Sequence, residues 1–520
     1  VLYISMCIYI VYSSDDKFLE VISPAGTFKG TALLSLQGHI YTAYLAIPYA
    51  LPPVGRLRFA KPKPYPKMEH VFDATHIAPT CIQPSGIDLG SPSQEDCLYL
   101  NVYVPDQDTE VEPILKKVFV FIHGGGFFMG SSREYMPGDL VAVGDVLVVT
   151  FNYRLSWLGF VKGNTSELPG NQGMWDQLMA LQWVKDNIKS FGGDPEDITV
   201  GGNSMGSESI SALSIIPHGM GLFTKALLMS GAMFSSPSTP GSSDVLLDLL
   251  TDRVGCKLES IDHTVRCLRE LPADKFILPV EGRLTNKFTT IDLDLFPFPI
   301  TDLIKDKEYL RKVGFYNRDY IVSLTNNEGA VEFFGPFDLG ADPDTMSASF
   351  LSQKFNIPVS VCEKILAWYQ QPDHFTFNPA YDILDDYILA APTYKFLQVA
   401  VSDINETDQD KNGNSYFLYF DHLPSYLPSA LQGICHGMDL MYLFDLQPDQ
   451  MLQYYYNLHT SDEFSDVDFQ MKNTYIGMLT DFMKSGDPSV TLREKFNVQW
   501  SAFDLKSENC LSFGPIPSVK

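Results

Sequence analysis

The chain has 520 residues, with 63 Asp and Glu against 37 Lys and Arg, which gives a formal net charge of −26. This negative charge repels the phosphates of nucleic acids and anionic lipids, so we exclude nucleic acid as a partner. Hydrophobic residues make up 45% of the chain and charged residues 19%, a composition typical of a globular protein rather than a disordered one.

The N-terminal segment, residues 1–14, is almost wholly apolar or small and is followed by Asp15 and Asp16. We interpret it as the remnant of a secretory signal peptide, with a short N-terminal strand as the alternative. Glycosylation sequons that begin at Asn164 and Asn405 agree with secretion. No later run reaches the ~20 apolar residues of a membrane helix. The sequence therefore predicts a secreted protein without a membrane span.

Short β-rich runs alternate with helical patterns along the chain. The runs are Val118–Ile122, Val146–Phe151, Ile198–Val200, Lys225–Met229, Tyr320–Leu324 and Tyr416–Phe420. Between them, Gly173–Lys189 has the pattern of an amphipathic helix. This alternation predicts an α/β fold whose mostly parallel sheet is covered by helices on both faces. Residues 240–318 have helical periodicity and predict an insertion that caps the sheet. No linker divides the chain, so we expect one domain over residues 15–520.

Two pairs of the eight cysteines bracket short polar loops. Cys81 with Cys97 and Cys256 with Cys267 are the spacings expected of disulfides in a secreted protein. No C-x-x-C pair occurs, so the spacing does not predict a zinc site or any other metal site. We expect buried thiols rather than a third bridge at Cys362, Cys435 and Cys510.

The segment Gly202-Asn-Ser204-Met-Gly206 follows a β-branched run and precedes an apolar, helix-compatible run. In a G-x-S-x-G turn, small residues allow the serine to stand on a sharp turn between strand and helix, with its hydroxyl exposed above the sheet. The pattern predicts Ser204 as a nucleophile. An ordinary strand-to-helix turn is the alternative.

Three glycines after His123 suggest an oxyanion hole. An apolar strand runs into Gly124-Gly125-Gly126, whose backbone N–H groups are open to a ligand. A tetrahedral intermediate needs two or three such donors. We predict Gly125 and Gly126 as donors, together with the N–H of Met205.

The nucleophile needs a base and an acid, which follow it in the order acid, then histidine, in enzymes with this elbow. The candidate bases are His374, His422, His436 and His459. His436 is favoured because small residues surround it, and His422, just past a strand, is its rival. Glu328 follows the strand Tyr320–Leu324, where a carboxylate can fix the tautomer of a histidine. Asp439 is the alternative acid.

Together these motifs resemble the type-B carboxylesterases, the cholinesterase and carboxylesterase family, over nearly the whole chain. The matching segments are Ala46–Phe59, Glu95–Asn101, His123–Phe127, Asn152–Arg154, Gly170–Gly173, Phe191–Pro195, Gly202–Gly206, the Asn-Glu-Gly around Glu328, and His436–Asp439. The resemblance implies an α/β-hydrolase fold and the two short-loop disulfides. The site residues that it implies are a triad of Ser204, Glu328 and His436 and an oxyanion hole from Gly125, Gly126 and the N–H of Met205.

The chain departs from the family pattern at two places. Asn203 and Met205 flank the serine where the family usually has GESAG, so a neutral amide replaces a carboxylate and a longer side chain stands beside the nucleophile. Ser156 and Trp157 stand where the family usually has Gly-Pro or a similar pair, which we interpret as a local packing change.

The resemblance implies a carboxylic ester hydrolase that acts on a small-molecule ester through an acyl-enzyme and needs no cofactor. The alternative is a cholinesterase-like adhesion or binding protein without catalysis. Cholinesterases hold the quaternary ammonium of choline on a tryptophan of the first disulfide loop. The loop between Cys81 and Cys97 contains no aromatic residue, so we expect poor turnover of acetylcholine relative to a neutral ester.

Overall fold

The computed structural model describes residues 19–84, 93–106, 114–163, 165–235, 242–277, 294–296, 298–334, 342–355, 357–371, 378–402, 413–428, 431 and 433–520. The predicted signal remnant at residues 1–14 and the sequons at Asn164 and Asn405 lie outside these residues.

An α/β-hydrolase fold is built on a mixed sheet of eleven strands in the described residues, in the order β14-β13-β12-β11-β10-β9-β7-β8-β6-β4-β3. These strands are β3 (Thr31–Leu34), β4 (Ile40–Pro48), β6 (Tyr99–Pro105), β7 (Lys116–Ile122), β8 (Leu147–Phe151), β9 (Gly193–Asn203), β10 (Lys225–Met229), β11 (Asp319–Thr325), β12 (Ser415–Phe420), β13 (Cys510–Phe513) and β14 (Ser518–Val519). The block from β8 to β13 is parallel, and antiparallel strands flank it on both sides. A smaller sheet joins β1 (Glu20–Ser23), β2 (Gly26–Lys29) and β5 (Phe72–Asp73).

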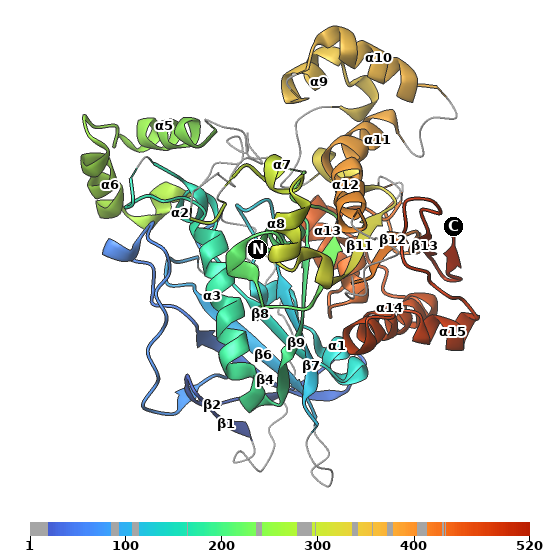
Figure 1. Ribbon diagram of the computed structural model, residues 1–520, viewed down its shortest axis with the longest axis horizontal. Coiled ribbons are helices and arrows are strands. Elements are labelled where there is room, and N and C mark those ends of the chain that lie inside the picture. The colour runs from blue at the N-terminus through green and yellow to red at the C-terminus, as the bar shows by residue number, and fades with distance from the viewer. Residues whose placement is uncertain are drawn as a thin grey trace.

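The central strands are buried on both faces, which explains their continuous apolar runs. In β7, Val118 and Val120 belong to one hydrophobic core, and Phe119 and Phe121 belong to the other. The first core includes residues of α3 (Gln172–Asn187) and α4 (Met205–Leu213). The second includes residues of α1 (Gly138–Gly144) and α14 (Asp466–Ser485). Figure 1 shows α3 on one side of the strands and α1 with α14 on the other.

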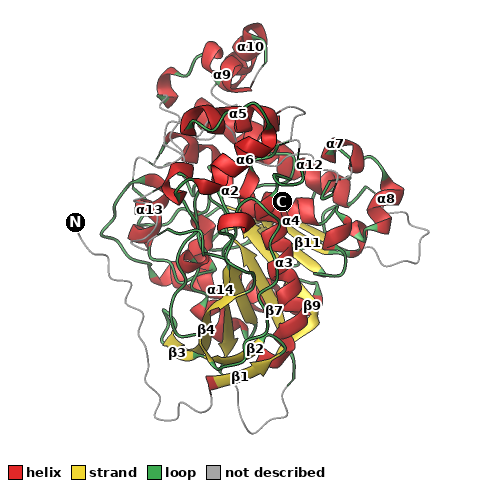
Figure 2. Cartoon of the chain, turned by 90° about the vertical axis from the view of Figure 1, so that its left-hand side faces the viewer, coloured by secondary structure: helices red, strands yellow, loops and turns green. Residues whose placement is uncertain are grey.

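The remaining helices follow the carboxyl ends of the strands. After β10 come α5 (Ser242–Val254), α6 (Ile261–Glu270), α7 (Ile300–Leu303) and α8 (Lys307–Lys312). After β11 come α9 (Ala348–Phe355), α10 (Val359–Tyr369), α11 (Pro379–Asp385) and α12 (Ala391–Ala400). Others are α2 (Ser156–Phe160), α13 (Pro448–Tyr456) and α15 (Val490–Phe496). The helices from α5 to α12 gather over one end of the sheet in Figure 2, so the described helices of the segment 240–318, α5 to α8, contribute to a helical cap as the sequence predicts.

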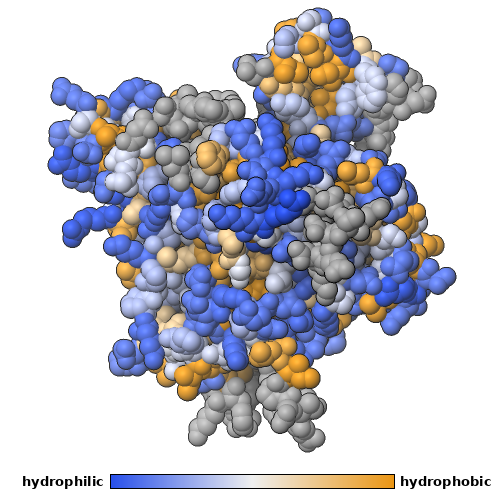
Figure 3. Space-filling model, in the orientation of Figure 1, coloured by the Kyte–Doolittle hydropathy of each residue, from blue (hydrophilic) through white to orange (hydrophobic). Residues whose placement is uncertain are grey.

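The surface in Figure 3 is largely hydrophilic, with apolar side chains gathered over α9 and α10. There Val361 and Trp368 are 42% and 50% exposed. None of the helices in the described part of the chain is both long and apolar enough to cross a membrane.

Candidate active site

Five neighbouring strands bring the predicted site residues to one edge of the sheet. The strands lie in the order β7-β9-β10-β11-β12 and are parallel, so their carboxyl ends share this edge. In the same order they are followed by the glycine loop, Ser204, Ser230, Glu328 and the loop that carries His436. Ligands of open α/β sheets bind outside the carboxyl ends of the strands, so this edge is where a substrate is expected.

Ser204 stands on a strained turn between β9 and α4. Its φ is 56° and its ψ is −124°, a conformation that costs energy for a residue with a side chain. Its N–H donates to Met229 O at 2.8 Å, and its carbonyl accepts from Glu208 N–H at 2.9 Å. Ser204 is partly exposed while Asn203 and Met205 are buried, so of these three residues only the serine is accessible to solvent.

The two glycines of the elbow are required by close packing. A Cβ on Gly206 would stand 2.1 Å from Ile122 O, and one on Gly202 would stand 2.8 Å from the same oxygen. Both distances are far below a van der Waals contact. The elbow therefore presses against the end of β7, and this contact brings the serine next to the glycine loop.

The glycine loop lies directly against the elbow. A Cβ on Gly124 would stand 3.1 Å from Ser204 Cβ. The Gly125 carbonyl accepts from the N–H groups of Phe128 and Met129 at 3.1 and 3.0 Å. Because the C=O and N–H of a trans peptide point in opposite directions, the Gly126 N–H points away from that turn. The N–H of Met205 is in the first turn of α4 and has no acceptor inside the helix.

His436 and Glu328 form a hydrogen bond of 2.6 Å between Nδ1 and Oε2, and both side chains are buried. Their loops are joined by backbone as well, since Asn327 N–H donates to Ile434 O at 3.1 Å. A bond at Nδ1 leaves Nε2 to accept a proton from a serine hydroxyl, as a general base requires.

Ser230, which the sequence analysis missed, holds the other oxygen of the carboxylate. Its Oγ donates to Glu328 Oε1 at 2.5 Å, and Thr325 N–H donates to the same oxygen at 2.7 Å. The signal that could have found Ser230 is its place directly after the predicted strand Lys225–Met229. With these bonds and that of His436, both oxygens of the buried carboxylate are hydrogen-bonded.

Charge and burial set the pKa values of the histidine loop. Burial opposes the charged form of His436, but the carboxylate of Glu328 outweighs it, so the pKa of His436 is raised above its ordinary value. Burial, followed by the charge of Glu328, raises the pKa of Asp439 to about 7. Because Nδ1 of His436 is bonded to Glu328, Asp439 does not replace Glu328 as the acid beside His436.

The rival histidines have other surroundings. His422 Nε2 lies 2.7 Å from Asp468 Oδ1 at the start of α14. His459 is an exposed side chain beside Asp449, and His374 lies outside the described residues. Over the described ranges, no group of three His, Cys, Asp or Glu side chains is arranged to hold a metal ion.

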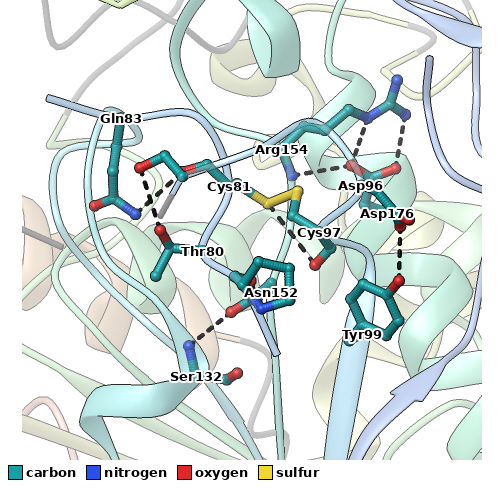
Figure 4. The surroundings of a disulfide bond; sticks show 12 residues. Thr80, Cys81, Gln83, Asp96, Cys97, Tyr99, Ser132, Asn152, Arg154 and Asp176 are labelled. Atoms are coloured by element: carbon teal, nitrogen blue, oxygen red, sulfur yellow. Dashed lines mark hydrogen bonds and ion pairs between the residues drawn. A yellow bond between two sulfur atoms is a disulfide. The ribbon is translucent and has the colours of Figure 1, made fainter. Parts of the chain in front are cut away.

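Disulfide bonds join Cys81 to Cys97 and Cys256 to Cys267. Figure 4 shows the first of them beside Gln83, whose amide donates to Gly130 O and accepts from Gly130 N–H. Gly130 follows the glycine loop, so the first disulfide segment is hydrogen-bonded to the chain beside the predicted oxyanion hole. Of the remaining cysteines in the described chain, Cys362 and Cys435 are buried thiols, whereas Cys510 is partly exposed, so the expectation of a buried thiol there is only partly met.

Ser156, at the second departure from the family pattern, has a φ of 55°, which favours glycine. Its Oγ is buried without a hydrogen-bond partner among the residues that the structure describes. The change at this position is therefore a strained backbone as well as altered packing.

Comparison with known proteins gives a consistent result. The sequence model of the carboxylesterase family matches residues 17–520. Acetylcholinesterase-1 of Trittame loki is 30% identical over 541 residues, which cover 95% of this chain and 91% of that protein. The cholinesterase of Mus musculus is 30% identical over 490 residues, covering 86% of this chain and 77% of that protein. Neuroligin-3 of Mus musculus is 28% identical over 545 residues, covering 92% and 64% respectively.

Proposed function

The chain belongs to the carboxylesterase family, and on this premise we propose that it is a serine ester hydrolase. Ser204 is the nucleophile, His436 the general base and Glu328 the partner of that base. The observation that carries the proposal is the buried 2.6 Å hydrogen bond from His436 Nδ1 to Glu328 Oε2 at the same sheet edge as the strained Ser204.

In this mechanism Ser204 Oγ attacks the carbonyl carbon of the ester while His436 Nε2 takes its proton. The N–H groups of Gly125, Gly126 and Met205 stabilise the oxyanion of the tetrahedral intermediate. The alcohol leaves with the proton from His436, and an acyl-enzyme remains. Water then attacks with His436 again as base, which releases the acid and restores Ser204. No metal or organic cofactor takes part.

Secretion and a single catalytic domain over residues 15–520 are part of the proposal. The two disulfides support an oxidising compartment. The large sheet supports one domain, because its strands run from Thr31 to Val519 and it is continuous in hydrogen bonding.

A fluorophosphonate probe tests the proposal, because it reacts only with an activated serine. We expect labelling at Ser204 in the native protein and none in Ser204→Ala. Hydrolysis of a nitrophenyl ester should disappear in the same variant. Folded native protein that stays unlabelled would instead support the alternative of a non-catalytic binding protein. The similarity to neuroligin-3, at 28% identity, is the reason to retain this alternative.

The substrate is a neutral ester rather than a choline ester in this proposal, because residues 82–96 include no aromatic side chain. The test compares acetylthiocholine with a nitrophenyl ester of similar acyl length. A higher kcat/KM for acetylthiocholine would contradict the proposed preference without affecting the proposed nucleophile.

A further inference from the structure

Helix α13, which follows the histidine loop, ends in two buried tyrosines. Tyr455 and Tyr456 are 5% and 1% exposed. The hydroxyl of Tyr456 donates to the main-chain carbonyl of His436 at 2.6 Å. The hydroxyl of Tyr455 is 2.8 Å from that of Tyr135, which lies just after the glycine loop. One helix end therefore contacts the histidine loop and the segment that follows the glycine loop.

The loop that carries His436 needs such an anchor. Gly433 and Gly437 stand on either side of His436 with φ values of 121° and 78°. Glycines allow the backbone more conformations than other residues, so the loop needs other contacts to hold His436 in one position. The N-terminal half of the loop is tied to the Glu328 loop, because Ile434 N–H donates to Asn326 Oδ1 at 2.7 Å. The bond from Tyr456 fixes the carbonyl of His436 itself.

The ring of Tyr456 also reaches the loop of the acid. It packs edge-on against Phe334, with 6.3 Å between ring centroids, and Phe334 follows the short helix Glu328–Phe333. Burial raises the pKa of the Tyr456 phenol well above its ordinary value, so the phenol remains a donor over the working pH range. One side chain thus contacts the base loop by its hydroxyl and the acid loop by its ring.

We propose that Tyr456 is a positioning residue that sets the location of the His436 imidazole relative to Ser204 and Glu328. This inference rests on the proposed function. Tyr456 acts through the main chain of His436 and does not touch the substrate. A misplacement of a reacting group by about 1 Å can cost on the order of 100-fold in rate, so a bond that fixes the base is expected to act on kcat rather than KM.

The test compares Tyr456→Phe with Tyr320→Phe. Tyr320 is also 1% exposed and donates to a main-chain carbonyl, Phe315 O at 3.0 Å, but at the opposite end of β11 from Glu328. Both variants lose one buried phenol-to-carbonyl bond and should lose similar thermal stability. With a nitrophenyl ester, we expect Tyr456→Phe to lower kcat by about tenfold with KM unchanged, and to slow fluorophosphonate labelling to a similar extent. Tyr320→Phe should keep both rates.

Equal kcat values in the two folded variants would overturn the inference while leaving the proposed function intact. An inactive and unlabelled wild type would overturn both. If Tyr456→Phe does not fold, 4-fluorophenylalanine at position 456 replaces it, since the fluorine fills the place of the hydroxyl but donates no hydrogen bond. A lower kcat at position 456, without one for 4-fluorophenylalanine at 320, supports the inference, and equal values overturn it.

Discussion

Replacing Glu328 with glutamine changes the hydrogen-bonding pattern around His436 without changing the shape of the side chain. In the native protein, Oε1 accepts from Ser230 Oγ and Thr325 N–H, and Oε2 is bonded to His436 Nδ1. The amide oxygen of glutamine must take the first position, because two donors face it there. Its NH2 then faces Nδ1, which has to become an acceptor, so the proton of His436 moves to Nε2.

That tautomer cannot take the proton of Ser204. A wrong tautomer of the base in a serine triad costs about 10⁴ in kcat, or about 5.4 kcal/mol of barrier. A second effect distinguishes a changed tautomer of His436 from a general loss of folded structure. Because the charge of Glu328 raises the pKa of His436, its loss should lower that pKa. Activity requires neutral His436, so the acid limb of the residual kcat/KM profile should move to lower pH.

The assay is nitrophenyl ester hydrolysis from about pH 5 to 9, with fluorophosphonate labelling as a second readout. Glu332→Gln is the matched control, because Glu332 lies in the same short helix but pairs with Lys354 at 3.0 Å, and its charge raises the pKa of His436 less than that of Glu328 does. We expect the control to stay close to the wild type. The tautomer argument is refuted if Glu328→Gln keeps more than about a tenth of the wild-type kcat/KM, since the expected loss is about 10⁴.

Three further outcomes follow from the same contacts. Ser230→Ala removes the 2.5 Å bond to Glu328 and should lower kcat/KM by about tenfold, measured beside its melting temperature. Burial opposes the charge of Asp468, but its hydrogen bonds outweigh burial and lower its pKa to about 2. As the pH falls, Asp468 is protonated in the unfolded chain at a higher pH than in the folded protein. Asp468 therefore stabilises the fold above about pH 4, and that stabilisation is lost as the pH falls toward 2. Urea unfolding at pH 5 and pH 3 should show a larger loss of unfolding free energy, by about 1 kcal/mol, in the wild type than in Asp468→Asn. Ser156→Gly should stabilise the protein by about 1 kcal/mol in urea, whereas Ser156→Ala, which keeps the φ of 55°, should not.

The parts of the fold that could be predicted are those where local sequence and burial agree. All six predicted runs are parallel strands of the central sheet, because strands buried on both faces are continuously apolar. Ser204 and Glu328 each follow such a strand closely, so position in the chain already indicated the edge where they lie. In contrast, β4 and β6 interleave Tyr, Thr and Asn with apolar residues and gave no continuous run.

Contacts between distant segments could not be predicted from the sequence. Ser230 and Glu328 are 98 residues apart, and His422 and Asp468 are 46 apart, so no local pattern joins them. In the sequence, the Tyr-rich end of α13 indicates only an ordinary helix face. The contact of Tyr456 with the histidine loop becomes evident only in the folded structure. Such bonds depend on tertiary packing, which periodicity does not report.

Asn203 gains a physical explanation from its surroundings. Its side chain is 1% exposed, its Nδ2 donates to Met229 O at 3.5 Å, and its Oδ1 lies 3.6 Å from the place of a Cβ on Gly437. An aspartate in place of Asn203 would face the Met229 carbonyl without a donor and would add a buried negative charge beside the histidine loop. Burial and the charge of Glu328 raise the pKa of the nearby Asp439 to about 7, and a buried carboxylate at position 203 would be opposed by the same two causes. The amide of Asn203 supplies a donor to the Met229 carbonyl and adds no charge, so it is compatible with the buried carboxyl groups of Glu328 and Asp439 nearby.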